Sequence, residues 1–252
     1  EIGVRLVGSE MCIRDKREMA LEVVKNYQIG PLFTPPGRPI EGGTQGTLMR
    51  PPDFGAAGWA GAAVDPETGI LYVPSRNIAV AIPLYAPDPD LGSTMRYTHG
   101  APEQQRLQQI RQGQSYNAQM PQGLPLLKPP YSRITAIDMN TGDHVWMVPL
   151  GNGDRVRNHP RLRDLDLPPV GDGTIAGPVL TKTLLISSVP TGGPSGGPGL
   201  VAWDKQTGEI RGTVDLPTGP VGTPMTYMVE GKQYIAVAIG GGPRIIAYAL
   251  PD

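Results

Sequence analysis

A five-residue pattern, Asp-x-x-Thr-Gly, occurs three times in the chain, each time between two apolar runs. The copies begin at Asp65, Asp138 and Asp204. An Asp side chain can accept a hydrogen bond from the backbone of its own turn, and Gly takes the positive φ that closes the turn. The pattern therefore predicts β-hairpins and constrains the chain to a fold built mainly of short antiparallel strands.

Further strand-like runs follow without this pattern and are bounded by Gly and Pro. They cover residues 177–180, 183–189, 225–229, 233–239 and 244–250. About a dozen strands, at four strands per blade, correspond to roughly three blades of a β-propeller. Because a closed propeller needs at least four blades, we expect an all-β, partial propeller with one N-terminal helix.

The composition fits this fold and argues against both nucleic-acid binding and a membrane-spanning helix in this chain. Of 252 residues, 39% are apolar, which is enough for a buried core, and 34 Gly with 29 Pro suit a chain of many turns. Lys and Arg number 22 against 23 Asp and Glu, so the broad basic field of a general nucleic-acid binder is missing. No apolar run approaches the roughly 20 residues of a membrane-spanning helix.

The N-terminal segment differs from the rest in amino-acid composition. Residues 1–15 hold the single cysteine, Cys12, and we interpret them as a non-native tail, with an edge strand over residues 2–7 as the alternative. Apolar residues at helical spacing then predict an amphipathic helix from Lys16 to about Asn26. Residues 16–252 would form the propeller part. Residues 86–130, rich in Pro, Gln and Gly, read as a long insertion with one helical stretch over 102–112.

Several patterns invite a chemical interpretation, and each has a simpler structural one. Gly193-x-Ser195-x-Gly197 matches a hydrolase nucleophile elbow, but a strand instead of a helix is expected after it, so an inter-strand loop is favoured. The three His residues, the Asp88-Pro89-Asp90 segment and the Arg/Asp-rich loop over 154–166 favour solvated turns. Trp59, Trp146 and Trp203 favour packing between blades over cofactor stacking.

The amino-acid sequence of the repeats resembles that of a known family. Residues 136–146, Ala-Ile-Asp-Met-Asn-Thr-Gly-Asp-His-Val-Trp, look like the tryptophan-docking repeat of the pyrroloquinoline-quinone (PQQ) dehydrogenases, and residues 202–212 do so with Gly212 in place of the tryptophan. The loops over 122–131 and 157–160 resemble the membrane-bound, glucose-type subgroup, and residues 222–238 its last blade. The chain is similar to the C-terminal portion of such an enzyme.

This resemblance implies an eight-bladed propeller that holds PQQ and Ca²⁺ and oxidises an alcohol or a glucose-like sugar. Electrons would pass to a quinone or cytochrome, in the periplasm and in association with the inner membrane. A carboxylate base and the metal as Lewis acid would assist the oxidation. The family's catalytic aspartate and metal ligands lie in blades that precede this segment, so the chain is expected to supply neither and to be inactive alone.

The resemblance places four cofactor neighbours in the chain: Gly58, Trp59, Ile175 and Gly177. The family often has Asn-Trp where this sequence has Gly58-Trp59, so that Asn side chain is missing here. A branch of the family has a tryptophan at the position of Ile175. The alternative to an enzyme is a cofactor-free propeller that binds partner proteins through its rim or edge strands.

Overall fold

The computed structural model describes residues 10–31, 33–87, 90, 92–99, 119–120 and 123–249. The chain divides into two compact units, which are described separately. One comprises residues 1–54 and 78–128, and the other residues 55–77 and 129–252.

Among its described residues, the first unit holds one helix and two short strand pairs. Helix α1 spans Glu10–Val24. Strand β1 (Thr47–Met49) pairs with β4 (Val80–Ile82), and β5 (Leu84–Tyr85) pairs with β6 (Thr98–His99). The helix thus begins earlier and ends two residues sooner than the apolar spacing predicted. That residues 1–15 are non-native stays a prediction, and the helical stretch over 102–112 lies outside the described residues.

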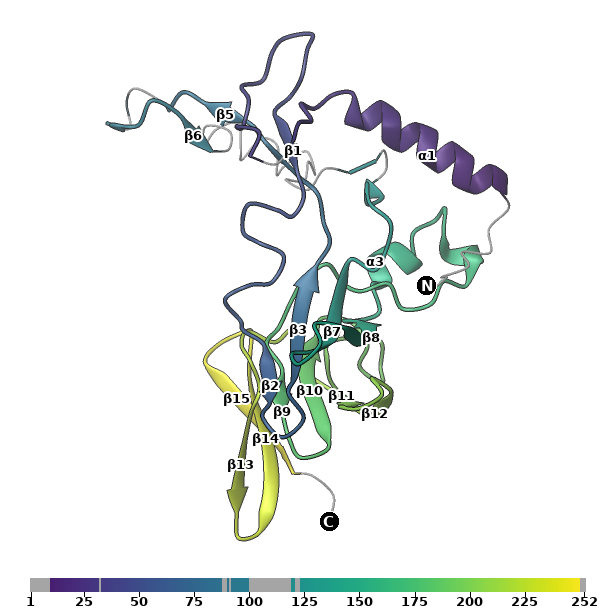
Figure 1. Ribbon diagram of the computed structural model, residues 1–252, viewed down its shortest axis with the longest axis vertical. Coiled ribbons are helices and arrows are strands. Elements are labelled where there is room, and N and C mark those ends of the chain that lie inside the picture. Colours follow the sequence, from purple (N-terminus) through teal and green to yellow (C-terminus); the bar gives the residue numbers. More distant parts are fainter. Residues whose placement is uncertain are drawn as a thin grey trace. The chain divides into compact units, whose positions relative to one another are not determined.

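The second unit contains three antiparallel sheets (Figure 1). Their orders are β2-β3-β7-β8, β9-β10-β11-β12 and β13-β14-β15. The strands are β2 (Ala63–Asp65), β3 (Ile70–Arg76), β7 (Ser132–Asp138), β8 (His144–Pro149), β9 (Val179–Leu180), β10 (Leu184–Val189), β11 (Gly199–Asp204), β12 (Ile210–Asp215), β13 (Met225–Val229), β14 (Lys232–Ile239) and β15 (Arg244–Ala249). The predicted strands are confirmed, with ends that differ by at most two residues. Between β8 and β9 lie helix α3 (Asp154–Arg157) and the 3₁₀ helix η3 (Arg163–Leu165).

The first sheet of this unit is interrupted in sequence. Strand β3 pairs with β7 in continuous register from Ile70↔Asp138 to Arg76↔Ser132, although residues 77–131 separate them along the chain. The long excursion is therefore inserted between the second and third strands of one sheet.

The three Asp-x-x-Thr-Gly turns share one backbone geometry. The Gly N–H donates to the Asp carbonyl oxygen, at 2.8 Å in the first copy, 2.7 Å in the second and 2.9 Å in the third. Each Asp Oδ1 also accepts a backbone N–H from the second residue after it. The Gly φ values of 72°, 82° and 75° confirm the left-handed conformation that the pattern predicts.

These copies do not occupy equivalent places in their sheets. The first joins β2 to β3, the first and second strands, whereas the others join third to fourth strands, β7 to β8 and β11 to β12. The second and third copies also share a register shift directly before the turn, at Ala136/Ile137 and at Ala202/Trp203. The pattern thus identifies a type of turn, and the number of residues between its copies does not correspond to the length of one blade.

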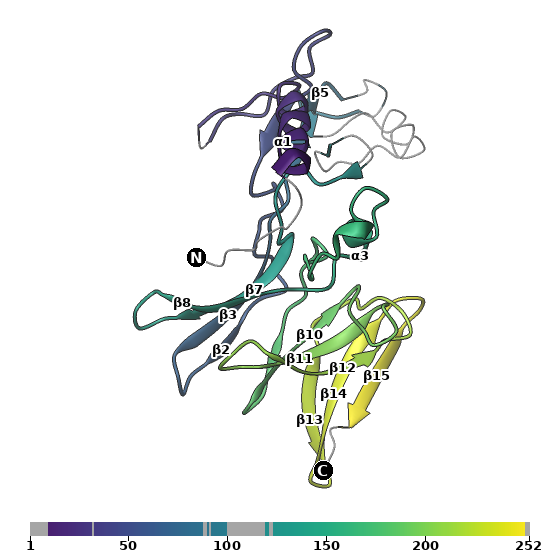
Figure 2. The same ribbon diagram turned by 90° about the vertical axis from the view of Figure 1, so that its right-hand side faces the viewer.

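The middle sheet packs against both of its neighbours (Figure 2). One core lies between it and the β2-β3-β7-β8 sheet, and a second lies between it and the β13-β14-β15 sheet. The first core consists of Tyr72, Ile134, Ala136, Leu150, Leu185, Val189, Val201 and Trp203. The second consists of Ile186, Leu200, Leu216, Ile235, Val237 and Ile239. Alternate residues of β10 contribute to each, as a strand buried on both faces requires. Trp203 is buried, as predicted for packing between blades.

Trp146 links the first sheet to the turn of the next one. Its Nε1–H donates to the Lys205 carbonyl oxygen at 3.1 Å. The indole lies against Gly208 so closely that a Cβ there would come within 2.9 Å of Trp146 Cδ2. This geometry confirms Trp146 as a tryptophan docked on the neighbouring blade.

Lys205 receives two more contacts from the first sheet. Its carbonyl oxygen also accepts the Tyr72 hydroxyl at 3.0 Å, and its Nζ lies 2.6 Å from Asp65 Oδ2. Both charged side chains are buried, and the hydrogen bond from Lys205 holds the pKa of the Asp65 carboxyl below its usual value. One residue of the middle sheet thus accepts hydrogen bonds from two aromatic side chains and neutralises a buried carboxylate.

We predict that Trp146→Ala lowers the free energy of unfolding by about 3–5 kcal/mol, because it removes a large packed side chain and a hydrogen bond between sheets. Denaturant unfolding measures this change. Trp59→Ala is the matched control, since the Trp59 side chain is 98% exposed and its loss should change stability by no more than about 0.5 kcal/mol. Equal effects of the two substitutions would contradict the docking role of Trp146.

Candidate functional site

The segments that lead into β2, β9 and β13, at one edge of each sheet, meet one another. A Cβ on Gly177 would collide with the Ala60 carbonyl oxygen and with Thr223 Oγ1. The Thr223 hydroxyl donates to that same carbonyl oxygen at 3.4 Å. Residues from all three sheets therefore converge here, and we call Ala60, Gly177 and Thr223 with their neighbours the inner rim.

All four residues predicted to neighbour a cofactor lie at the inner rim. A Cβ on Gly58 would lie 2.7 Å from Ile175 Cδ1, so the glycine allows these two segments to approach. Gly177 is buried and Ile175 is partly buried. Trp59, in contrast, is the most exposed large apolar side chain among the described residues. The expectation that Trp59 packs between blades is wrong, because its indole is almost fully open to solvent.

Thr223 is a rim residue that sequence reasoning missed as a site residue. It lies in Gly222-Thr223-Pro224, directly before β13, as Gly177 lies before Pro178 and β9. A Gly or Thr before Pro at the start of a sheet's first strand is the signal that could have identified it.

The segment that carries Ile175 and Gly177 is held by polar contacts on both sides. The Gly173 N–H donates to Ser132 Oγ at 3.1 Å, and the Ser187 hydroxyl donates to the Ala176 carbonyl oxygen at 3.3 Å. Asp172 anchors the start of the segment through its carboxylate. Burial raises the pKa of Asp172 above its usual value, against the opposing effect of hydrogen bonds from Thr191 and Gly153.

Within the part of the chain that the structure describes, the other patterns with a chemical interpretation do not form sites. Ser195 lies in a loop between β10 and β11, as expected, and its hydroxyl donates to Asp215 Oδ2 at 2.7 Å. In the charged loop, Arg157 lies 3.6 Å from Asp154, and Arg163 lies 3.8 Å from Asp164. His159 Nδ1 accepts the Arg161 N–H at 3.2 Å, as in a turn. Asp88 lies outside the described residues.

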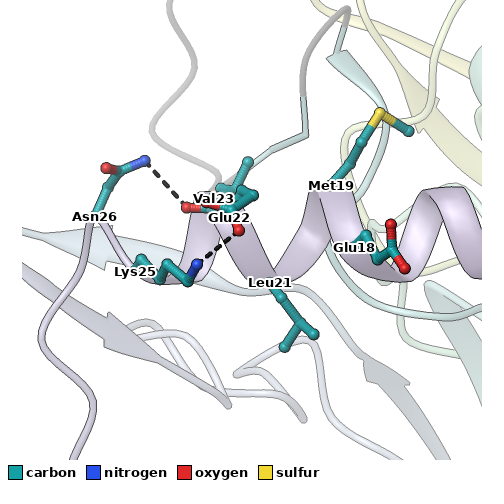
Figure 3. A pocket seen from close by; sticks show the side chains of 7 residues that line it. All are labelled: Glu18, Met19, Leu21, Glu22, Val23, Lys25 and Asn26. Carbon is teal, nitrogen blue, oxygen red and sulfur yellow. Dashed lines mark hydrogen bonds and ion pairs between the residues drawn. The ribbon is translucent and has the colours of Figure 1, made fainter.

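Among the described residues, a hollow along helix α1 is lined by side chains of one segment (Figure 3). Lys25 Nζ lies 2.6 Å from Glu22 Oε1, and Asn26 Nδ2 donates to the Glu22 carbonyl oxygen at 3.5 Å. The lining residues are Glu18, Met19, Leu21, Glu22, Val23, Lys25 and Asn26. Groups from a single helix that pair with each other do not converge on a ligand, so we do not assign a site to this hollow.

In the described part of the chain, no three His, Cys, Asp or Glu side chains gather in a group that could hold a metal ion. Among the same residues, no helix is both long and apolar enough to cross a membrane.

Three antiparallel sheets that pack face to face and meet at an inner rim define a partial β-propeller. Residues 9–235 match the PQQ family, which is described as "Glucose/ethanol/alcohol dehydrogenase, beta-propeller domain". Because this match covers most of the chain, the chain belongs to that family, and the family resemblance of the repeats is confirmed.

Curated relatives are similar over most of the chain. The quinoprotein glucose dehydrogenase of Escherichia coli (strain K12) is 29% identical over 88% of this chain and 28% of its own length. The quinate/shikimate dehydrogenase (quinone) of Acinetobacter baylyi is 30% identical over 90% of this chain and 28% of its own length. The chain thus spans little more than a quarter of these relatives.

Among solved structures, the quinohemoprotein alcohol dehydrogenase from Comamonas testosteroni aligns over 77% of this chain and 23% of its own. The TM-score is 0.49 and the identity is 22%.

We predict that Gly177→Ala disrupts the inner rim, because the new Cβ would meet a carbonyl oxygen of one sheet and a hydroxyl of another. Overpacking of this kind costs about 1–3 kcal/mol, measured as a lower free energy of unfolding. Gly222→Ala is the control at the same rim, since nothing lies within 4 Å of a Cβ at that position. A Gly177→Ala protein as stable as the control would contradict the convergence of the three segments.

Proposed function

We propose that the protein to which this chain belongs is a PQQ-dependent dehydrogenase that oxidises an alcohol or a glucose-like sugar. In this proposal the chain supplies one wall of the cofactor site, formed by Gly58, Trp59, Ile175 and Gly177 at the inner rim. The single observation that carries the proposal is the exposed Trp59 indole beside a rim from which side-chain bulk is excluded.

The residues present fit a flat aromatic cofactor. An indole with both faces accessible can stack on a planar ring, and such stacking is favourable when the rings are offset. Because Gly58 and Gly177 lack a Cβ, the neighbouring segments come close together and leave backbone and the Ile175 side chain as the adjoining surface. The Ca²⁺ that accompanies PQQ in this proposal would take its ligands from other parts of the protein.

In the proposed reaction a hydroxyl-bearing carbon is oxidised to a carbonyl, and PQQ supplies the two-electron acceptor. The residues of this chain bind and orient: Trp59 would stack on one ring face, and Ile175 would limit the tilt of the ring and exclude water. The base that takes the hydroxyl proton lies, by this proposal, outside the chain.

Electron transfer and location follow from the same proposal. The electrons would pass to a quinone or a cytochrome, in the periplasm and at the inner membrane. Relatives whose names include "(quinone)" support the quinone as acceptor.

We predict that the full-length protein, supplied with PQQ and Ca²⁺, binds the quinone and reduces an artificial dye with glucose or another alcohol. Trp59→Ala should weaken PQQ binding about tenfold, since stacking between aromatic rings contributes roughly 0.5–1.5 kcal/mol beyond burial of ring area. Trp59→Phe, which keeps a flat ring, should retain most of the affinity. Quinone absorbance and quenching of tryptophan fluorescence measure the affinity, and dye reduction measures turnover.

Absence of PQQ binding by the full-length protein would contradict the proposal and would favour a cofactor-free scaffold. Unchanged affinity in Trp59→Ala would show that PQQ binds without this wall. Dye reduction by this chain alone would move the search for a base to Asp154, Asp164, Asp166 and His159.

A further inference from the structure

The Asp172 carboxylate joins two loops of the second unit, the one between β8 and β9 and the one between β10 and β11. Its Oδ1 accepts the Thr191 hydroxyl at 2.6 Å and the Gly153 N–H at 2.9 Å. Its Oδ2 accepts the Thr191 N–H at 3.0 Å. Gly153 and Asp172 lie near the two ends of the connection from β8 to β9, and Thr191 follows β10, so one side chain ties the link between two neighbouring sheets to a loop of the second sheet.

Three glycines with positive φ lie near this carboxylate. Gly151 has a φ of 85°, and a Cβ on it would collide with the Asp172 side chain. Gly153 and Gly171 also have positive φ, at 73° and 78°, and a Cβ on Gly171 would collide with the backbone of Ser132. A side chain is thus excluded at position 151 beside Asp172 and at position 171 beside Ser132.

Asp172 with its hydrogen bonds to Thr191 and Gly153 forms what we call the Asp172 clamp. Only a few residues along the chain separate this clamp from the wall of the proposed cofactor site. After Asp172, the next polar anchors along the chain are the Gly173 N–H on Ser132 and the Ala176 carbonyl oxygen on Ser187. Thr174 and Ile175 lie between these anchors. The position of the Ile175 side chain against Gly58 therefore depends on where Asp172 sets the start of the segment.

Joining loops through a partly buried carboxylate has an energetic cost. Desolvation penalises its charged form, and Asp154 adds a repulsive negative charge. Three donated hydrogen bonds oppose that penalty and, unlike apolar contacts, are directional. These directional hydrogen bonds fix the positions of the bonded loops relative to one another.

We propose that Asp172 is a positioning residue for the PQQ site: its clamp on Thr191 and Gly153 holds residues 173–177 so that Ile175 and Gly177 form the cofactor wall. This inference rests on the proposed function of the inner rim.

The same unit offers a matched control. Asp215, at the end of β12, accepts the Ser195 N–H at 2.9 Å and the Ser195 hydroxyl at 2.7 Å. It thus also clamps a loop through a backbone amide and a hydroxyl. That loop carries none of the four proposed cofactor neighbours.

The test uses the full-length protein with Asp172→Asn and Asp215→Asn, together with Thr191→Val and Thr191→Ser. The Asn amide would direct N–H groups at donors that now meet a carboxylate oxygen. Thr191→Val removes only the hydroxyl donor and keeps the side-chain shape, and Thr191→Ser keeps the hydroxyl. Two quantities are measured: the PQQ dissociation constant from quinone absorbance, and hydrogen exchange of peptides that cover residues 171–178.

We expect Asp172→Asn to raise the PQQ dissociation constant about tenfold, equivalent to about 1.4 kcal/mol, and to speed exchange in residues 171–178. Thr191→Val should act in the same direction, Thr191→Ser should restore wild-type behaviour, and Asp215→Asn should change neither quantity. The Asp172→Asn/Thr191→Val double variant should be no worse than the stronger single variant, because both break one clamp.

Unchanged exchange in Asp172→Asn and Thr191→Val, or equal loss of PQQ affinity in Asp172→Asn and Asp215→Asn, would overturn the inference. If the wild-type protein binds no PQQ, the proposed function fails. Exchange in residues 171–178 then decides by itself whether Asp172 positions the rim.

Discussion

The contact of Trp146 with the Lys205–Gly208 turn is the interaction on which the arrangement of the first two sheets depends. Gly208 is needed twice, for the positive φ that closes the turn and for the space that the indole fills. Because the Lys205 carbonyl oxygen accepts both the Trp146 and the Tyr72 donors, the turn is oriented as well as packed. The buried Asp65–Lys205 pair adds a charged link between the same two sheets.

This arrangement positions the inner rim at the opposite end of the strands that bear the docked turns. Packing of the sheets through their apolar faces brings their first strands together, and β2 contacts β9 there. At that point Gly58 and Gly177 lack a Cβ, so the neighbouring segments approach closely. In the proposed site, a planar ligand would remove part of the exposed Trp59 indole from water.

The proposed clamp supports the proposed site. The rim residues supply surface, while Asp172, Ser132 and Ser187 fix the segment that carries part of that surface. A wall made of Ile175 and backbone has no directional group of its own. Its precision must therefore come from hydrogen bonds behind it, as is general for preorganised sites.

The sequence by itself determined the local structure: the Asp-x-x-Thr-Gly turns, most strand positions and the family, since these depend on residues close together in the chain. It also indicated Gly58, Trp59, Ile175 and Gly177 through the family resemblance. Only the tertiary structure decided that β3 pairs with β7 across residues 77–131, that Trp59 is exposed while Trp203 is buried, and that Thr223 and Asp172 belong to the rim and its support. These features depend on contacts between residues far apart in sequence, which turn chemistry and periodicity do not encode.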